Sequence, residues 1–202
     1  MRKLASSFYL QDTLTVAQKL LNCRLVHCIN GKKIVGRIME TEAYIGPIDK
    51  ACHAYQFKRT QRTEPLFLAG GSAYVYFVYG MYHCMNVVTE GKDIPCAVLI
   101  RSIEILEGLK LASSLRYQLP YSSLSSKQRK NLADGPGKLC IAMGIDRKLN
   151  RENLSGNRLF ILPPKESSTE FVISQSKRIG IDYAEEAKDF LWRFSLVKIN
   201  DQ

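Results

Sequence analysis

Carboxylates beside an aromatic side chain are the first feature of this sequence that could carry chemistry. Glu40, Glu42 and Tyr44 alternate near the end of an apolar run over residues 33–44. Strands are depleted in glutamate, and in a regular strand the even-numbered residues from Ile34 to Tyr44 would share one face, with neighbours about 7 Å apart. A carboxylate beside an aromatic wall suits a general base that faces an aromatic ligand. Solvated carboxylates at a strand end are the simpler interpretation of this fragment alone.

A tyrosine-rich hairpin is the second feature. Residues 72–79 have the composition of a strand, and residues 80–81 fit a two-residue turn that begins with glycine. Tyr74 and Tyr76 share a face, where aromatic rings could stack on nucleic-acid bases. Tyr79 is expected at the tip, where a large side chain can act as a wedge between stacked bases. A tyrosine-rich core strand is the alternative for any one of these residues.

A glycine loop before a short apolar segment is the third feature. Gly135, Gly137 and Lys138 precede that segment, and backbone N–H groups at the start of a helix can bind a phosphate group. The spacing excludes a nucleotide-binding P-loop. A contact with a DNA backbone phosphate and a plain helix-start turn both remain open.

Net charge points to a polyanionic partner. The 202 residues include 29 Lys and Arg but 19 Asp and Glu, which gives a formal charge of +10. This surplus favours nucleic acid or an anionic membrane surface, although a basic soluble protein could also carry it. The 46% hydrophobic content excludes a disordered, collagen-like or coiled-coil chain. No stretch has the length of a membrane span and no signal peptide is evident, so we expect an intracellular protein.

Six cysteines show no paired zinc-type spacing. We interpret them as core thiols in a reducing compartment. A metal-dependent hydrolase that uses His27, His53 and cysteines is an alternative, and Cys23 and Cys28 on either side of His27 are a weak sign of such a site.

The remaining elements predict an antiparallel sheet with peripheral helices. Residues 13–22 have the apolar spacing of an amphipathic helix, and Asn30-Gly31 is a turn signal between two strands. Because the alternating order of a parallel sheet is missing, we expect one α+β domain over residues 1–202. Residues 113–131 should be a mobile loop or a marginal helix. The other predicted elements are strands at 24–27, 33–44, 82–89, 96–102, 159–162, 171–173 and 190–194, and a helix at 103–115.

Taken in order, these motifs resemble the alkyladenine (3-methyladenine) DNA glycosylase family. The resemblance spans nearly the whole chain and is most specific over residues 36–101. It implies a single mixed domain around a curved antiparallel sheet with a DNA-inserting hairpin, without metal or cofactor. The motifs are Glu-Thr-Glu-Ala-Tyr-x-Gly-Pro from Glu40, Asp-x-Ala-x-His from Asp49, Tyr-Val-Tyr-x-x-Tyr-Gly-Met-Tyr from Tyr74, Cys-Met-Asn-Val from Cys84, Asp-Gly-Pro-Gly-Lys-Leu-Cys from Asp134, Arg-Ile-Gly-Ile from Arg178 and Trp-Arg-Phe from Trp192.

The resemblance also implies a role for individual residues. Glu42 matches the glutamate that activates water, and Arg101 matches an arginine near that water. Thr63 stands where the family has asparagine. Residues that match the pocket for the flipped base are Tyr44, His53, Tyr76 and Asn86, of which Asn86 would disfavour guanine. Tyr79, with Met81 beside it, matches the residue that inserts into DNA. Contacts with the DNA backbone are expected from Lys138 and Arg62.

The implied function is a monofunctional DNA glycosylase in base excision repair. Its substrates would be alkylated or deaminated purines in double-stranded DNA: 3-methyladenine, 7-methylguanine, hypoxanthine and ethenoadenine. Electron-rich tyrosine faces favour the cationic alkylated bases, and no lysine nucleophile is indicated. We expect a monomer without a membrane partner, in the bacterial cytoplasm with the nucleoid or in the nucleus of a eukaryote. A DNA- or RNA-binding module without catalysis is the alternative, and the presence of Glu42 argues against it.

Overall fold

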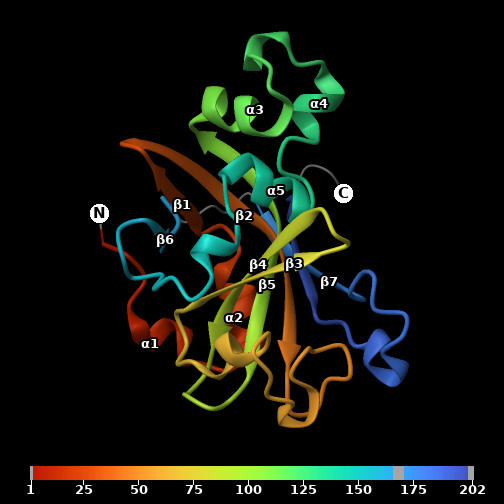
Figure 1. The fold of residues 1–202 in the computed structure, drawn as a ribbon. Helices are drawn as coiled ribbons and strands as arrows, with labels where there is room; N and C mark the ends of the chain where they lie inside the picture. Colours follow the sequence, from red (N-terminus) through yellow and green to blue (C-terminus); the bar gives the residue numbers. More distant parts are fainter. Residues whose placement is uncertain (1, 166–170, 200–202) are drawn as a thin grey trace.

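Antiparallel strands form the frame of the molecule in a computed structural model that describes residues 2–165 and 171–199. These residues form one α+β domain with eight strands in one sheet, as expected (Figure 1). The strands are β1 (Arg24–Ile29), β2 (Lys32–Ile45), β3 (Ala73–Val78), β4 (Tyr82–Thr89), β5 (Cys96–Glu107), β6 (Leu159–Leu162), β7 (Phe171–Ser176) and β8 (Arg193–Lys198). The α-helices are α1 (Ser6–Tyr9), α2 (Thr13–Leu20), α3 (Leu109–Tyr117), α4 (Ser126–Lys130) and α5 (Pro136–Met143).

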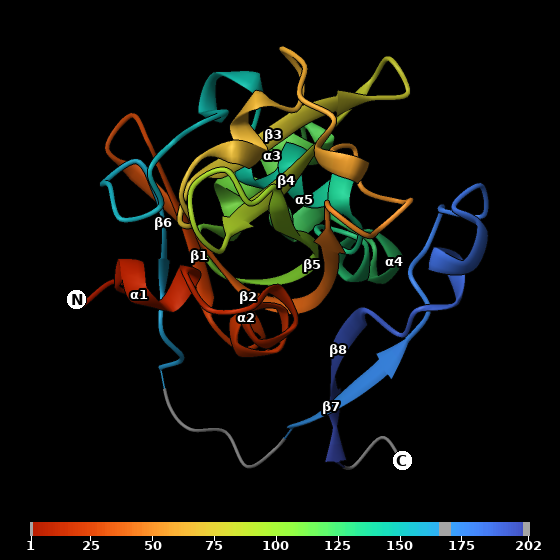
Figure 2. The same cartoon turned by 90° about the horizontal axis from the view of Figure 1, so that it is seen from below.

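Strand β2 lies at the centre of this sheet. One of its edges pairs with β5, which continues to β4 and β3. Its other edge pairs first with β1, next to β6, and farther along with β8, next to β7. The sheet is strongly curved, and β7 and β8 extend to one side of it (Figure 2). The C-terminal strands therefore reach the half of β2 that carries the glutamates.

Three β-bulges interrupt the pairing of β2 with β5, and two of them lie beside the glutamates. Ile38 pairs with Ile103 and Glu40 with Ser102, so Met39 is an extra residue in β2. Thr41 pairs with Ile100, so Arg101 is an extra residue in β5. Bulges bend a strand and redirect its side chains.

The bulge at Met39 corrects one prediction. The even-numbered residues of β2 do not share one face, because the alternation changes phase at the bulge. Ile34 and Ile38 lie in the main core, whereas beyond Met39 it is Ala43 that belongs to that core. Glu42 is buried but faces the opposite side of the sheet, together with Tyr44.

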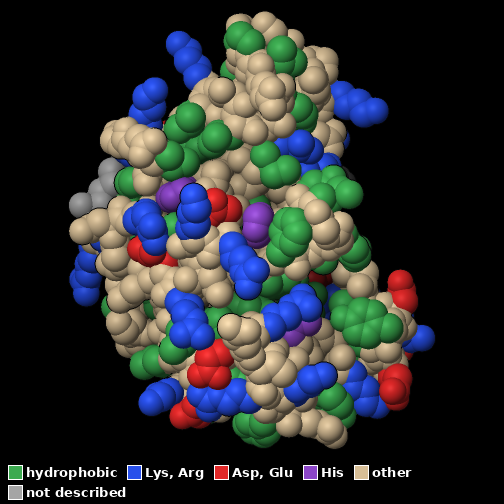
Figure 3. All heavy atoms as spheres, in the orientation of Figure 1, with side chains coloured by type: hydrophobic (Ala, Val, Ile, Leu, Met, Phe, Trp, Pro, Cys, Tyr) green, Lys and Arg blue, Asp and Glu red, His purple; other side chains and the backbone are tan. Residues whose placement is uncertain are grey.

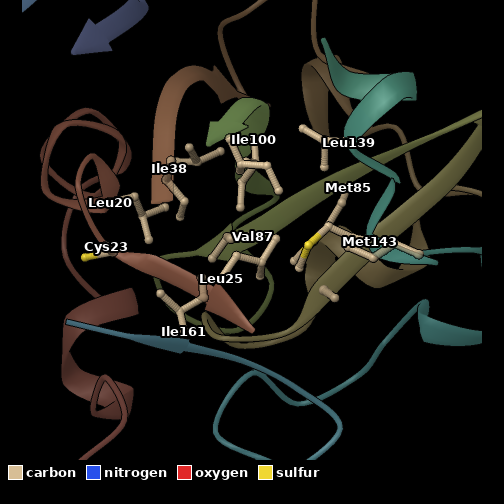
Figure 4. Packing of buried hydrophobic residues seen from close by; sticks show 14 of the residues in the cluster. Leu20, Cys23, Leu25, Ile38, Met85, Val87, Ile100, Leu139, Met143 and Ile161 are labelled. Carbon is tan, nitrogen blue, oxygen red and sulfur yellow. The ribbon is translucent and has the colours of Figure 1, made fainter. Parts of the chain in front are cut away.

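The main core lies between the sheet and helices α2 and α5. Leu20 from α2 and Leu139 and Met143 from α5 approach Ile38 and Ile100 from the strands (Figure 4). Asp12 caps α2 by accepting a hydrogen bond from the Thr15 N–H group. Burial of apolar side chains on one face of the sheet therefore holds α2 and α5 in place.

The opposite face of β3, β4 and β5 is covered by the segment that follows β2. Leu66 and Phe67 pack there against Tyr74 and Val88. The Thr63 hydroxyl donates a hydrogen bond to the Lys58 carbonyl oxygen at 2.8 Å and accepts one from the Thr60 N–H at 2.8 Å. Thr63 thus closes this loop from within.

The structure corrects two further predicted elements, and for residues 113–131 it agrees with the alternative of a short helix. The helix expected at 103–115 begins only at Leu109, as α3, because β5 continues to Glu107 in its pairing with β2. Residues 113–131 are folded into the end of α3, a short turn and α4, and Ser125 and Gln128 form a capping box. The last strand begins at Arg193 rather than at residue 190.

Gly108 makes the change from strand to helix possible. Its φ is +83°, and a Cβ there would lie 2.6 Å from the Lys33 carbonyl oxygen. A side chain is excluded by both the conformation and the space. The turn therefore ends β5 at the point where its partner β2 begins.

The described part of the chain gives three further findings, on its cysteines, on possible metal ligands and on its helices. All six cysteines are free, and all except the half-buried Cys28 are buried. Among the described residues, no three His, Cys, Asp or Glu side chains are grouped as they would be to hold a metal ion. Of the helices described, none has the length and apolar character needed to span a membrane.

Candidate active site

A row of paired residues crosses the second face of the sheet. Tyr74 on β3 pairs with Asn86 on β4, Asn86 pairs with Leu99 on β5, and Leu99 pairs with Glu42 on β2. Since paired residues in a sheet point to the same side, the pairing brings the predicted glutamate and asparagine together with the tyrosine strand.

A pocket of about 520 Å³ opens over this row. Its volume falls within the usual range for a site that binds a small molecule, about 300–1,000 Å³. The predicted residues Tyr44, His53, Tyr76, Asn86 and Arg101 line it. Tyr79 and Lys138 also belong to the lining. Residues from β2, the loop after it, β3, β4, β5 and α5 therefore meet in one cavity.

Glu42 lies behind the pocket wall and is fully buried. Its Oε2 accepts hydrogen bonds from the Tyr44 hydroxyl at 2.8 Å and from Arg101 Nη1 at 3.2 Å. Its Oε1 accepts one from the Ile179 backbone N–H at 2.9 Å. These donors compensate a buried carboxylate, and all three residues that supply them line the pocket.

Arg101 joins two carboxylates on the pocket side of β2. It contacts Glu42 through Nη1, and its Nε lies 3.5 Å from Glu40 Oε1. Arg193 on β8 also donates to Glu40 Oε1, at 2.8 Å. The interpretation of solvated carboxylates at a strand end is therefore wrong for Glu42, which is fully buried, while Glu40 is 17% exposed and paired with two arginines.

Burial keeps the Tyr44 hydroxyl a donor. Desolvation, and then the negative charge of Glu42, raise the pKa of Tyr44 well above its usual value. The phenol therefore stays protonated at neutral pH and keeps its hydrogen bond to the carboxylate. The expected placement of Glu42 and Tyr44 on one face is confirmed.

Aromatic rings form the pocket wall over β3. The His53 ring lies edge-on to Tyr76 at a centroid distance of 4.7 Å, and Tyr74 and Tyr76 are 5.1 Å apart. His53 Nδ1 and the Tyr74 hydroxyl form a hydrogen bond of 3.0 Å. Burial, and then the charge of Arg62, lower the pKa of His53 to about 4. His53 is therefore neutral at physiological pH.

Arg62 lies beside this wall instead of on a separate surface. Its guanidinium is 5.4 Å from the centre of the Tyr76 ring, and its Nη2 is 3.5 Å from His53 Nε2. The side chain is exposed. It stays available to an anion at the rim of the pocket.

The β3–β4 hairpin holds the most exposed aromatic side chain of the pocket. Tyr79 is 80% exposed, and Met81 beside it is 63% exposed. The loop has three residues rather than two, because Val78 pairs with Tyr82. Tyr79 and Gly80 both have positive φ, as in a type I′ turn, and the Met81 N–H donates to the Val78 carbonyl oxygen.

Cationic side chains from helices α5 and α3 line the rim of the pocket. Lys138 lies in its first turn and donates a 2.8 Å hydrogen bond to Asn131. Gly137 allows β4 to approach, since a Cβ there would lie 3.0 Å from the Tyr82 ring. Arg116 from α3 lines the same rim. Lys and Arg side chains also spread over the face of the molecule that carries the hairpin (Figure 3).

The predicted residues are thus largely brought together, and the structure adds others. Arg116 and Tyr183 line the pocket, although no role for them was predicted, and Tyr74 lines it beside Tyr76 as the shared face indicated. Asp49 and Arg178 belong to the motifs identified in the sequence, but nothing in their spacing shows that they form a buried ion pair. In the sequence, the pair is indicated only by two charged residues that stand in otherwise apolar or loop segments.

Comparison with known proteins agrees with this geometry. A relative from Clostridium perfringens is 53% identical over 95% of this chain and 94% of its own length. Relatives from Clostridium acetobutylicum (51% identical, 95% and 93%) and Desulfitobacterium hafniense (48% identical, 97% and 96%) align as completely. Their names propose 3-methyladenine DNA glycosylase activity for them. A family model described as methylpurine-DNA glycosylase matches residues 7–199. This chain therefore belongs to the methylpurine-DNA glycosylase family.

Proposed function

We propose that this protein is a monofunctional DNA glycosylase that removes damaged purines from double-stranded DNA. The observation that carries the proposal is the buried Glu42 carboxylate, which shares one row of the sheet with the wall of an aromatic pocket. Membership of the methylpurine-DNA glycosylase family and the names of the relatives support the same activity. The substrates would be 3-methyladenine, 7-methylguanine, hypoxanthine and ethenoadenine.

Base recognition follows from the wall of rings. Tyr76 and Tyr74 present electron-rich faces, which attract a cationic alkylated purine. A neutral His53 does not repel such a base. Asn86 would disfavour guanine in this pocket, and the hydrogen bond from its Nδ2 to the Tyr74 carbonyl oxygen at 3.1 Å restricts its side chain.

Hydrolysis would use Glu42 as the base for one water molecule. The water oxygen bonds to C1′ of the deoxyribose, Glu42 takes the proton, and the N-glycosidic bond breaks. The base leaves with the electron pair of that bond, so a cationic 3-methyladenine leaves as a neutral molecule. Oε1 has the capacity for this role, because among the described residues it accepts one hydrogen bond, from the Ile179 N–H. The carboxylate also stabilises positive charge on the sugar.

Access to the base would require the nucleotide to leave the duplex. Flipping costs a few kcal/mol, and the exposed Tyr79 is suited to fill the space that the nucleotide leaves. Arg62 and Lys138 would hold the backbone phosphates. A strand-cleaving activity would need an amine nucleophile. Among the described lining residues, Lys138 is the one lysine, and its Nζ donates a hydrogen bond to Asn131. Because this amine is already engaged, we propose hydrolysis without lyase activity.

Base release from defined duplexes tests this proposal. The substrates are oligonucleotides that contain hypoxanthine or ethenoadenine, together with methylated DNA from which released bases are measured. The variant Glu42→Gln keeps the shape of the side chain and removes the charge. We expect it to bind DNA but to release base at least about 10²-fold more slowly, the usual effect of losing a general base.

Glu104→Gln is the matched control, because Glu104 is an exposed carboxylate on β5 whose ion pair with Arg37 lies away from the pocket. It should release base at the wild-type rate. If the wild type binds DNA but releases no base from any substrate, the protein is a DNA-binding module instead.

A further inference from the structure

Asp49 and Arg178 form a fully buried ion pair between two loops. Both side chains are 0% exposed, and Arg178 Nη2 donates to Asp49 Oδ1 at 2.8 Å while Nη1 donates to Oδ2. Arg178 also donates to the carbonyl oxygens of Ala43 at 2.9 Å and Ala187 at 3.0 Å. The pair therefore joins the loop after β2, the edge of β2 and the C-terminal segment at one point.

This pair touches the groups that hold Glu42, without touching Glu42 itself. The Arg178 guanidinium lies 4.7 Å from the centre of the Tyr44 ring, and the Tyr44 hydroxyl donates to Oε2. The next residue in the chain is Ile179, and its N–H donates to Oε1. Two of the three described donors to Glu42 thus depend on where Arg178 is held.

Stability alone is a weak reason for such a pair. Removing two charges from water is costly, and apolar residues of similar volume often stabilise a core equally well. Arg178 Nε, moreover, is buried and has no hydrogen-bond partner in the described part of the chain. What apolar side chains could not reproduce is the fixed bidentate geometry between the two loops.

We propose that Asp49 and Arg178 are positioning residues for the glycosylase reaction, an inference that rests on the proposed function. Asp49 fixes Arg178, and Arg178 fixes the Tyr44 ring and the Ile179 amide. These two donors set the orientation of the Glu42 carboxylate toward the water and C1′. Neither side chain lines the pocket or is exposed to solvent, so the pair acts on the chemical step and not on DNA affinity.

Single-turnover base release and DNA affinity, measured separately, test the inference. Asp49→Asn keeps the size of the side chain and loses its charge, and Arg178→Lys keeps the charge and loses the planar fork. We expect each variant to release base about 10²-fold more slowly, the effect of misplacing a reacting group by about 1 Å. The dissociation constant for DNA that contains an abasic site should stay within about twofold of the wild type, since the contacts at the rim are intact.

Two exposed ion pairs supply matched controls. Asp189→Asn breaks the pair with Lys177 in the same C-terminal segment, and Arg158→Lys alters the pair with Glu152. Both should release base at the wild-type rate. Equal losses in the controls and in the buried variants would overturn the inference.

A double variant keeps the test valid if a single variant does not fold. Asp49→Asn with Arg178→Gln leaves no unpaired buried charge, which is the main cost of breaking such a pair. Circular dichroism establishes that it is folded, and its base release should then be slow while its DNA affinity is normal. A folded double variant with wild-type base release would overturn the inference.

The result is separate from the outcome for the proposed function. If the wild type releases base and Glu42→Gln does not, the glycosylase activity holds whatever the pair does. Wild-type release in all folded Asp49 and Arg178 variants would then remove the positioning role alone. If the wild type itself releases no base, both proposals fail.

Discussion

The two faces of strands β2 to β5 are built from alternating residues of the same segments, yet they differ in chemistry. Val75, Val87 and Ile100 point into the core between the sheet and helices α2 and α5. Their neighbours Tyr76 and Asn86 line the pocket on the other side. One face is apolar and closed, and the other combines rings, buried charges and an opening to solvent.

Within each strand, residues on the core face should therefore contribute mainly to stability, and residues on the pocket face mainly to base release. Side chains on the core face stabilise the sheet through burial, so their loss should lower stability and leave the reaction geometry intact. Side chains on the pocket face are held by hydrogen bonds and ion pairs with specific partners. Their loss should change base release more than stability. Adjacent residues of one strand can therefore be used to test one effect against the other.

Ile100→Ala should give the largest change in stability. Ile100 is fully buried in the main core, and removing a buried isoleucine side chain typically costs about 2–5 kcal/mol. Urea unfolding measures the loss, and single-turnover base release at low temperature should match the wild type. A loss of base release in the folded variant would mean that the two faces are coupled through the strand.

Tyr79→Ala should change activity without changing stability. The side chain is 80% exposed, so the thermal unfolding midpoint should match that of the wild type. Stacking of one aromatic side chain is worth about 1–3 kcal/mol, so base release from duplex DNA should fall about tenfold to hundredfold. Release from single-stranded DNA, where no gap needs filling, is the internal control. An equal loss on both substrates would assign Tyr79 to the pocket rather than to flipping.

His53→Gln should change how stability depends on pH, which is the smallest effect. The folded protein holds the pKa of His53 near 4, whereas an unfolded chain has a usual value of about 6.5. The unfolded state thus binds a proton first as pH falls. The stabilisation is complete above about pH 6.5 and is lost as pH falls toward 4.

Urea unfolding at pH 7.5 and pH 5 checks this prediction. The wild type should lose more stability between the two pH values than His53→Gln, since all other titrating groups are common to both proteins. Identical losses would show that His53 is protonated in the folded state as easily as in the unfolded state.

Much of the site could be predicted because strand alternation is a local property. Glu42 and Tyr44 share a face, as do Tyr74 and Tyr76, and the spacing of two residues is enough to show it. The turn at Asn30-Gly31 likewise follows from the two residues themselves, both of which have positive φ.

Other features depended on pairing between distant strands. Residues 103–107 have an apolar spacing compatible with a helix, but pairing with β2 extends β5 through them. The bulge at Met39 is set by the register between β2 and β5, in which Met39 has no paired residue on β5. Neither strand carries this information alone, so the change of face between Ile38 and Glu42 was not predictable.

The sequence by itself determined the local elements and the types of residue available for chemistry: an acidic and aromatic strand, a tyrosine hairpin, a basic surface and buried thiols. Tertiary structure decided which of them meet. Asp49 and Arg178 are 129 positions apart, and Glu42 and Ile179 are 137 apart. Contacts at such separations form only when the whole sheet assembles, because burial of its apolar face must first offset the entropy of closing long loops.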